Sequence, residues 1–265
     1  MRHLRIFLLH LQYAFELRSR SFVWFLISFI NASIYLLFWQ GALRTGNVIV
    51  EGLSLSGITS YYLLLIIAGA FLTVHIDEDI ALGDIKQGHL VKYLTRPFSY
   101  FWIKFIEEIP WRIIQGLFGV FVLVGYITIF HIQVNLIGQA QGIFFAVVIV
   151  VLAYMISFVF SMIVGLSALW VVEYSGLQQL VTVITLVLAG YVIPIEFLPS
   201  LIGLVARALP FAYMAYFPVI AIQGAMDSGA MIHTIGIQAV WLFVFLILYS
   251  QVWRRGIKRF TGVGQ

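Results

Sequence analysis

The residues of this sequence that could do chemistry are densest in the run His75-Ile-Asp-Glu-Asp79. Imidazole and carboxylate groups are the usual protein ligands of divalent metal ions. Consecutive residues of a helix point in different directions, however, so few of these side chains could converge on one ion. The run therefore indicates the solvated end of a helix, and no metal site is predicted here.

Other patterns with a recognised chemistry are absent from the sequence. There is no Gly-x-x-x-x-Gly-Lys-Ser/Thr motif to hold ATP phosphates, no His-Glu-x-x-His motif and no Gly-x-Ser-x-Gly motif. Lys92 and the pair Arg96-Pro97 are spaced too closely for a lipid-phosphatase signature, and its companion residues are missing. Cysteine is absent, which excludes disulfides and thiolate chemistry. We therefore predict no catalytic residue and no cofactor bound by this chain.

The composition of the 265-residue chain is that of an integral membrane protein. Apolar residues make up 62% of it and charged residues only 10%, against about 45–50% and about 25% in soluble domains. With a mean hydropathy of +1.04, too few polar side chains remain to cover a surface that faces water. A soluble enzyme, a disordered protein and a nucleic-acid-binding protein are thereby excluded, so the net charge of +4 needs another explanation.

Uncharged intervals along the chain predict six transmembrane helices. A helix crosses the bilayer with about 20 apolar residues, and backbone in hydrocarbon must satisfy its own hydrogen bonds. The interval 113–172 is long enough for two helices, with a break near the polar stretch 131–141. The predicted fold is all-α and forms one transmembrane domain, with spans at residues 21–43, 53–76, 111–131, 142–171, 176–195 and 229–252.

The positions of the basic residues predict the orientation. All of the 15 Lys and Arg residues except Arg44 and Arg207 lie in the segments 1–20, 77–112 and 254–259, on one face of the six-span arrangement. Positive charge collects on the cytoplasmic side of membrane proteins. Both termini are therefore predicted to be cytoplasmic in a multi-pass protein of the cell membrane, and the positive net charge reflects this topology together with attraction to anionic lipid headgroups.

The N-terminal residues 1–20 are predicted to form an amphipathic helix in the cytoplasmic interface. Apolar residues such as Phe7 and Phe15 lie on a side that Arg5 and Arg18 largely avoid. A plain charged lead-in to the first span is the alternative.

Proline interrupts the apolar region between the fifth and sixth spans. Pro194, Pro199, Pro210 and Pro218 divide it into pieces of about ten residues, each too short to cross the membrane. We interpret residues 196–224 as extracellular re-entrant or interfacial helices. A seventh span kinked at Pro210 is the alternative, although it would place the two basic termini on opposite sides.

The cytoplasmic connection 77–110 is the longest in the predicted topology and the only one dense in charge. Residues 84–95 fit a short helix that ends before the Arg96-Pro97 pair. A polar helix beneath two spans is a natural docking element for a soluble partner. The uncharged intervals that hold the predicted spans contain no Asp, Glu, Lys or Arg, which counts against an ion-coupled carrier.

Three landmarks carry a resemblance to a known family. They are Asp84-Ile-Lys-Gln-Gly-His-Leu-Val-Lys-Tyr-Leu-Thr-Arg-Pro97, Ile193-Pro-Ile-Glu-Phe-Leu-Pro199 and Leu209-Pro-Phe-Ala-Tyr-Met-Ala-Tyr-Phe-Pro218. Together with the interfacial helix and the six spans, they resemble the membrane subunit of an ABC-2 type exporter. Within that group, they resemble the permeases of about this length whose ATPase is encoded as a separate chain.

The resemblance implies a division of labour among these residues. A coupling helix in the first cytoplasmic loop sits in a cleft of the ATPase, the loop at 173–176 makes a second cytoplasmic contact, and the region 193–218 forms an extracellular roof over the pathway. ATP and Mg would bind the partner ATPase, and a second permease, identical or related, would complete the pathway in the bilayer. The coupling residues would be Gly88, Leu90, Tyr93, Leu94, Arg96 and Pro97, the second contact Glu173 and Tyr174, and the roof residues Pro194, Glu196, Phe197, Pro199, Pro210 and Pro218.

The leading hypothesis is therefore a permease subunit that forms half of an export pathway for a hydrophobic or amphipathic substrate, such as a lipid, drug or lipopeptide. The alternative is a self-sufficient channel or facilitator, which has no need of a docking helix in the 77–110 loop. A membrane-embedded enzyme would need a polar constellation that the sequence does not supply.

Overall fold

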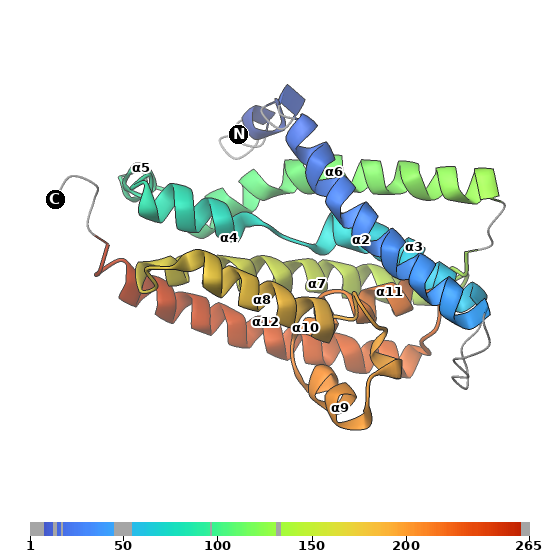
Figure 1. Cartoon of the computed structure of the whole chain (residues 1–265). Helices are drawn as coiled ribbons and strands as arrows, with labels where there is room; N and C mark the ends of the chain where they lie inside the picture. The colour runs from blue at the N-terminus through green and yellow to red at the C-terminus, as the bar shows by residue number, and fades with distance from the viewer. Residues whose placement is uncertain are drawn as a thin grey trace.

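The computed structural model describes residues 8–12, 15–16, 18–44, 55–95, 97–130 and 134–260. All regular secondary structure in these residues is helical, which confirms the predicted all-α class (Figure 1). The helices are α2 (Arg18–Arg44), α3 (Leu55–Leu72), α4 (Ile76–Glu78), the π-helix η1 (Asp79–Lys86), α5 (Val91–Leu94), α6 (Tyr100–Phe130), α7 (Ala140–Leu166), the 3₁₀-helix η2 (Ser167–Leu169), α8 (Tyr174–Leu188), the 3₁₀-helix η3 (Ile195–Phe197), α9 (Ser200–Ala208), α10 (Phe211–Met214), α11 (Tyr216–Gln223) and α12 (Ser228–Gly256).

Four helical stretches of the described residues are long and apolar enough to cross a membrane. They are Ser56–Lys86, Tyr100–Ile129, Ala140–Leu169 and Ser228–Gly256. The apolar helix α8 has only 15 residues, fewer than the roughly 20 that a straight crossing needs. The described residues thus support four spans by length and composition, and the six-span arrangement stays a prediction.

The long helices pack in a bundle, with α12 along α7 and with α2 and α6 against α3 (Figure 1). Much of α7 is apolar around its whole circumference, as expected for a helix whose neighbours are lipid or other apolar helices. Small residues of α7, including Gly142, Ala153, Ser157 and Gly165, are buried and allow other segments to approach closely.

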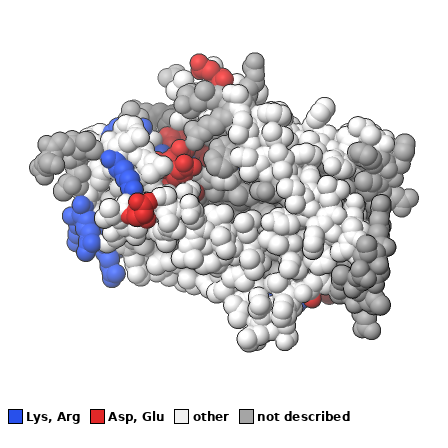
Figure 2. Space-filling view, viewed as in Figure 1, with Lys and Arg blue, Asp and Glu red and all other residues white. Residues whose placement is uncertain are grey.

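Charged side chains gather at one end of the bundle. Figure 2 shows Lys, Arg, Asp and Glu concentrated at the end where Figure 1 places α4, α5 and the C-terminal end of α12. The last residues of α7 and the first residues of α6 and α8 reach the same end. We call it the charged end.

The proline-broken region lies away from the charged end. It contains α9, α10 and α11, with 9, 4 and 8 residues, and each is shorter than a single crossing. Helix α11 packs on α7 and α3, and Gln223 Nε2 donates a hydrogen bond to the carbonyl of Gly57 at 3.1 Å. These three helices form a folded-back segment held against the bundle.

Two local predictions differ from the structure. The helix expected over 84–95 is wrong as a single element, because η1 ends at Lys86 and Gly88 adopts a left-handed φ of 76° that interrupts it. Helix α6 begins at Tyr100, well before the predicted span start at residue 111. Of the predicted N-terminal helix 1–20, residues 8–12, 15–16 and 18–20 are helical, and the remainder lies outside the described residues.

Candidate functional site

The candidate site is the segment from η1 to α5, at the charged end. Gly88 reverses the chain between the two helices, since its positive φ is a conformation that costs other residues about 1 kcal/mol or more. Backbone hydrogen bonds close the turn, including Leu90 N to the carbonyl of Asp84 at 2.8 Å. The segment is therefore a defined turn that presents α5 at the surface, rather than a loose loop.

Two of the predicted coupling residues point into the chain itself. Leu90 and Tyr93 are buried, and they pack in one apolar cluster with Ile80, Tyr100 and Ile103. Their burial fixes α5 to η1 and to the first turns of α6. These side chains act as internal anchors of the segment, and they are not open to a partner.

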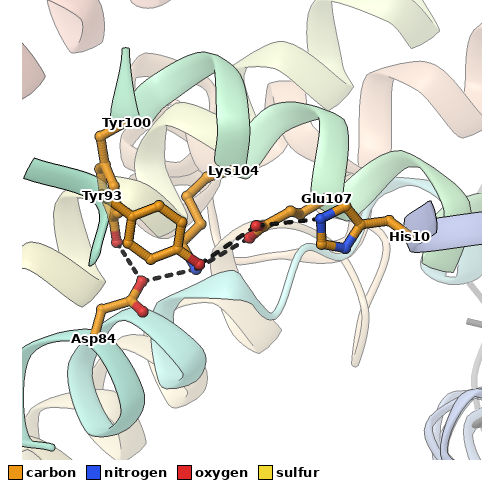
Figure 3. A network of polar contacts seen from close by, with 6 residues as sticks. All are labelled: His10, Asp84, Tyr93, Tyr100, Lys104 and Glu107. Carbon is orange, nitrogen blue, oxygen red and sulfur yellow. Dashed lines mark hydrogen bonds and ion pairs between the residues drawn. The ribbon is translucent and has the colours of Figure 1, made fainter. Parts of the chain in front are cut away.

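A buried polar network joins η1 to α6 (Figure 3). Lys104 Nζ lies 2.7 Å from Asp84 Oδ2 and 3.2 Å from Glu107 Oε2, and the Tyr100 hydroxyl donates to the same Asp84 oxygen at 2.7 Å. The side chains of Lys104 and Asp84 are only 6% and 5% exposed. Ions buried to this degree are tolerated only when they are paired and hydrogen-bonded, so the network fixes the register of η1 on α6.

Tyr93 adds a second layer to this network. Its hydroxyl donates to Glu107 Oε1 and accepts from Lys104 Nζ, each at 3.3 Å, and Lys104 Nζ also lies 4.8 Å from its ring centroid. Burial raises the pKa of Tyr93 to about 12, so the hydroxyl remains a neutral donor at neutral pH. His10 Nε2 approaches Glu107 Oε1 at 3.4 Å and brings the N-terminal segment to the same cluster (Figure 3).

An aromatic contact connects this segment to the last helix. The ring of Tyr100 stacks on Trp253 of α12, with centroids 4.8 Å apart and an interplanar angle of 11°. Offset aromatic pairs of this kind contribute about 0.5–1.5 kcal/mol beyond the area that they bury. The segment is thus held to α6 by charge and to α12 by stacking.

The outward side of α5 carries Val91, Lys92 and Leu94, which we call the exposed face of α5. Val91 and Leu94 are each 44% exposed although they are apolar. Pro97 is also exposed, whereas Gly88 is half-buried and Arg96 lies outside the described residues. Of the predicted coupling residues described, Leu94 and Pro97 alone present a largely open side chain.

The predicted second cytoplasmic contact also divides into an inner and an outer residue. Tyr174 is buried, and its hydroxyl donates to Asp77 Oδ2 at 2.7 Å. Glu173 is exposed and accepts a hydrogen bond from the Ser175 hydroxyl. Just before them, Val172 is 91% exposed, and its carbonyl accepts from Lys86 Nζ of η1 at 2.9 Å. This contact joins the two segments at the charged end.

The four roof prolines mark element boundaries or first turns. Pro194 precedes η3, Pro199 precedes α9, Pro210 precedes α10, and Pro218 lies in the first turn of α11. Proline lacks a backbone N–H, and the first turn of a helix has no acceptor for one, so all four positions suit it.

The other two roof residues hold this region together. Glu196 is exposed, and its Oε1 accepts a hydrogen bond from the Tyr216 hydroxyl at 2.8 Å. The ring of Phe197 lies 6.1 Å from that of Trp39 in α2. The region is therefore held by a hydrogen bond within it and by an aromatic contact with α2.

Sequence reasoning missed several residues that build the charged end, namely Asp77, Asp84, Tyr100, Lys104 and Trp253. One usable signal was the spacing of Lys104, Glu107, Glu108 and Arg112, because residues three and four apart meet on one helix face. Arg112 Nε lies 2.8 Å from Glu108 Oε1, as that spacing indicates. The pairing of Lys104 with Asp84 bridges two helices and leaves no such signal.

Comparison with known proteins gives one family. A family model described as "ABC-2 family transporter protein" matches residues 29–264 of the chain. No match was found among curated proteins. The matched range begins within α2 and includes the whole of α3, α6, α7 and α12. It also includes the whole of the η1–α5 segment.

Proposed function

We propose, because the chain belongs to the ABC-2 transporter family, that it is a permease subunit forming half of an export pathway driven by a separate ATPase. The family match and the four long apolar helices make it a multi-pass membrane component of an ABC-2 transporter. The ATPase partner, the export direction and the hydrophobic or amphipathic substrate are the parts that we propose beyond this.

The observation that carries the proposal is the way the η1–α5 segment is held. A helix that transmits the movement of a soluble partner to the membrane helices must be attached to them rigidly. Here the buried pair Asp84–Lys104 fixes the segment to α6, and the Tyr100–Trp253 stack fixes it to α12. An isolated loop of a passive channel needs neither contact, and the channel alternative therefore accounts less well for this arrangement.

We assign different roles to the coupling residues. Gly88 sets the turn, and Leu90 and Tyr93 anchor the segment, as their burial supports. Leu94 is proposed to enter a cleft of the ATPase together with Val91, with Arg96 and Pro97 at the edge of that contact. Glu173 and the adjacent Val172 are proposed as a second contact, because both are exposed at the charged end.

The topology proposed for this subunit keeps six spans with the charged end in the cytoplasm. The collection of charge at one end supports it, since basic residues collect on the cytoplasmic side. In this arrangement α2 and α8 supply the two further crossings, and α9–α11 form an extracellular re-entrant roof. Because the chain has no native cysteine, single cysteines at His89, Ser200 and Gly224 can be labelled selectively in intact cells. External label should reach the last two and not the first.

The coupling proposal is tested by Leu94→Asp. A charge at an apolar anchor is strongly unfavourable once buried, and loss of a central interface contact commonly costs about 2 kcal/mol or more, roughly thirtyfold in affinity. We expect the variant to insert into the membrane normally, to copurify with little ATPase and to lose export activity.

The matched control is Asp227→Asn, which removes a charge at the far end of α12 and leaves an acceptor for the N-cap hydrogen bond from Gly229 N. It should recover the ATPase as the unaltered chain does. Full ATPase recovery and full transport by Leu94→Asp would overturn the coupling proposal and favour the channel alternative.

A second permease subunit is proposed on the family resemblance, since one subunit supplies half of the pathway. The mass of the complex purified from the native membrane tests this. Two membrane subunits per complex are expected, either identical or related, and a complex with only one membrane subunit in total would exclude the half-pathway.

A further inference from the structure

A cavity of about 350 Å³ lies between α2, α3, α7 and α8. It is of the size that binds small organic molecules. Along α8 its wall runs from Gln178 to Leu186, which is about 12 Å at the rise of an α-helix. The cavity begins at the charged end and extends toward the middle of the bundle. It is therefore elongated along the bundle axis.

The end of the cavity nearest the charged end is polar and contains an acid. Asp77 lines it, and its carboxylate accepts from Ser161 Oγ at 2.9 Å, from the Tyr174 hydroxyl at 2.7 Å and from Gln178 Nε2 at 3.4 Å. These donors come from α7 and α8 and are all neutral. They orient the carboxylate and stabilise its charge without neutralising it.

Among the described residues that line the cavity there is no Lys or Arg, and His75 is the basic residue that lines it. Arg112 comes near, since its guanidinium donates to the carbonyl of Thr73, but its charge is paired with Glu108. The polar end of the cavity thus presents a carboxylate that neutral donors hold, with no Lys or Arg in the described lining, and such a group is uncommon at the edge of a membrane.

The remaining wall is apolar and aromatic. Leu65, Val181 and Leu186 give aliphatic surface, and the rings of Tyr35, Phe160 and Tyr191 line the same space. Aromatic faces attract cations as well as apolar groups. A carboxylate at one end and aromatic and aliphatic walls beyond it match a molecule with a positive head and an apolar body.

We propose that this cavity binds a cationic amphiphile, with an ammonium head at Asp77 and an apolar body between α2, α3 and α8. The proposal rests on the proposed function in that the ligand would be the exported substrate or a close analogue. An anionic amphiphile would meet the Asp77 charge in a low-dielectric setting, and a neutral one would leave that charge unpaired. Charge is therefore the property by which the site selects.

The experiment measures binding to the purified chain alone in lipid nanodiscs, without an ATPase. The probes are octanoylcholine and its uncharged isostere 3,3-dimethylbutyl octanoate, which differ only in a quaternary nitrogen replaced by carbon. The unaltered chain should bind octanoylcholine about tenfold more tightly or better, as expected for an interaction with a charged group. Equal affinity for the two probes would overturn the proposal.

Two variants locate the site. Asp77→Asn should abolish the preference for the cation, whereas Glu78→Gln removes a neighbouring carboxylate that does not line the cavity and should preserve it. Thr185→Trp fills the cavity away from the acid and should abolish binding of both probes. Its control is Val183→Trp on the same helix, at a position that is exposed and outside the cavity.

The outcomes separate this proposal from the proposed function. Because no ATPase is present, a chain that never couples to one can still show the charge preference. Conversely, a chain that binds the two probes equally can still recover its ATPase through Leu94. Retention of the cation preference by Asp77→Asn, or of binding by Thr185→Trp, would place the ligand elsewhere and refute the site.

Discussion

The two ends of the molecule are held together by different kinds of polar contact. At the charged end, side chains bond to side chains, as in Asp84 with Lys104 and Tyr100, or Asp77 with Ser161 and Tyr174. In the proline-broken region and in the turn that leads into it after α8, side chains bond mainly to backbone carbonyls. There the Tyr61 hydroxyl donates to the carbonyl of Gly190, and that of Tyr62 to the carbonyl of Val192, each at 2.8 Å.

The difference follows from the kind of polar group that needs a partner in each region. Breaking a helix within apolar surroundings leaves carbonyl groups without partners, and each must find a donor. Tyr and Gln side chains supply those donors in the proline-broken region. The charged end has few such carbonyls and holds ions that must be paired. We therefore expect substitutions to cost more at the charged end, and to change the position of the exposed face of α5 there.

The largest effect is expected for Lys104→Met. The change leaves Asp84 and Glu107 as adjacent carboxylates without their cation, and removal of one partner of a buried pair costs about 3–5 kcal/mol. Equilibrium unfolding in detergent measures the loss. ATPase recovery should fall with it, because α5 loses its attachment to α6.

The control for this prediction is Lys258→Met, which removes an exposed lysine near the C-terminal end of α12. Its effect should stay within about 0.5 kcal/mol. If Lys104→Met were as stable as this control, the buried network would not be what holds the charged end.

In the proline-broken region the largest effect is expected for Gln238→Leu. The buried Gln238 Nε2 donates to the carbonyls of Ile149 at 3.1 Å and of Tyr213 at 3.0 Å. The Ile149 carbonyl lies within α7 and keeps its helical hydrogen bond, so the change leaves the Tyr213 carbonyl without this donor. An orphaned buried group costs about 1–3 kcal/mol. The unfolding free energy should fall accordingly, while ATPase recovery per folded molecule should not change, since the exposed face of α5 is not involved.

The hydrophobic pattern of the sequence predicted the long helices well and their ends less well. Uncharged runs mark where a helix can face lipid, and α7 and α12 begin within two residues of the predicted spans. Helix α6 begins earlier because Lys104, Glu108 and Arg112 are paired within the protein and do not stop the helix. A charged residue therefore marks the end of a helix only when its side chain is solvated and is not paired within the protein.

The candidate site was predicted as a segment and not as a set of contacts. The charge density of the sequence marked this segment as a docking element, but it predicted one helix over 84–95 where the structure has a turn at Gly88. It could not show that Leu90 and Tyr93 point inward, because that depends on how η1 packs on α6. Likewise, Asp77 is separated in sequence from Tyr174 by 97 residues, and only the folded bundle brings them together.

A third prediction displaces the charged end without touching a charge. A Cβ at Gly165 of α7 would lie 2.8 Å from the backbone oxygen of Asp77 and 2.8 Å from Ile80 Cβ. Gly165→Ala should therefore push α4 and η1 away from α7, at a cost of about 1–3 kcal/mol typical of overpacking. Unfolding in detergent and ATPase recovery should both decrease.

The matched control is Gly125→Ala in α6, where an added Cβ would meet nothing within 4 Å. Alanine has the higher helix propensity, so this variant should be as stable as the unaltered chain or more stable. A Gly165→Ala chain indistinguishable from the Gly125→Ala chain would show that η1 can shift freely on α7, contrary to the rigid attachment described here.

The smallest effects allow the most direct test, because the same substitution can be made in both regions. Tyr100→Phe removes a donor to the Asp84 carboxylate, and Tyr62→Phe removes a donor to the neutral carbonyl of Val192. Hydrogen bonds to charged groups contribute about 1.5–3 kcal/mol and those between neutral groups about 0.5–1.5 kcal/mol. The Val192 carbonyl also keeps a second donor, Trp39 Nε1 at 3.4 Å. Unfolding free energies should therefore show the larger loss for Tyr100→Phe, and equal or reversed losses would contradict the distinction between the two ends.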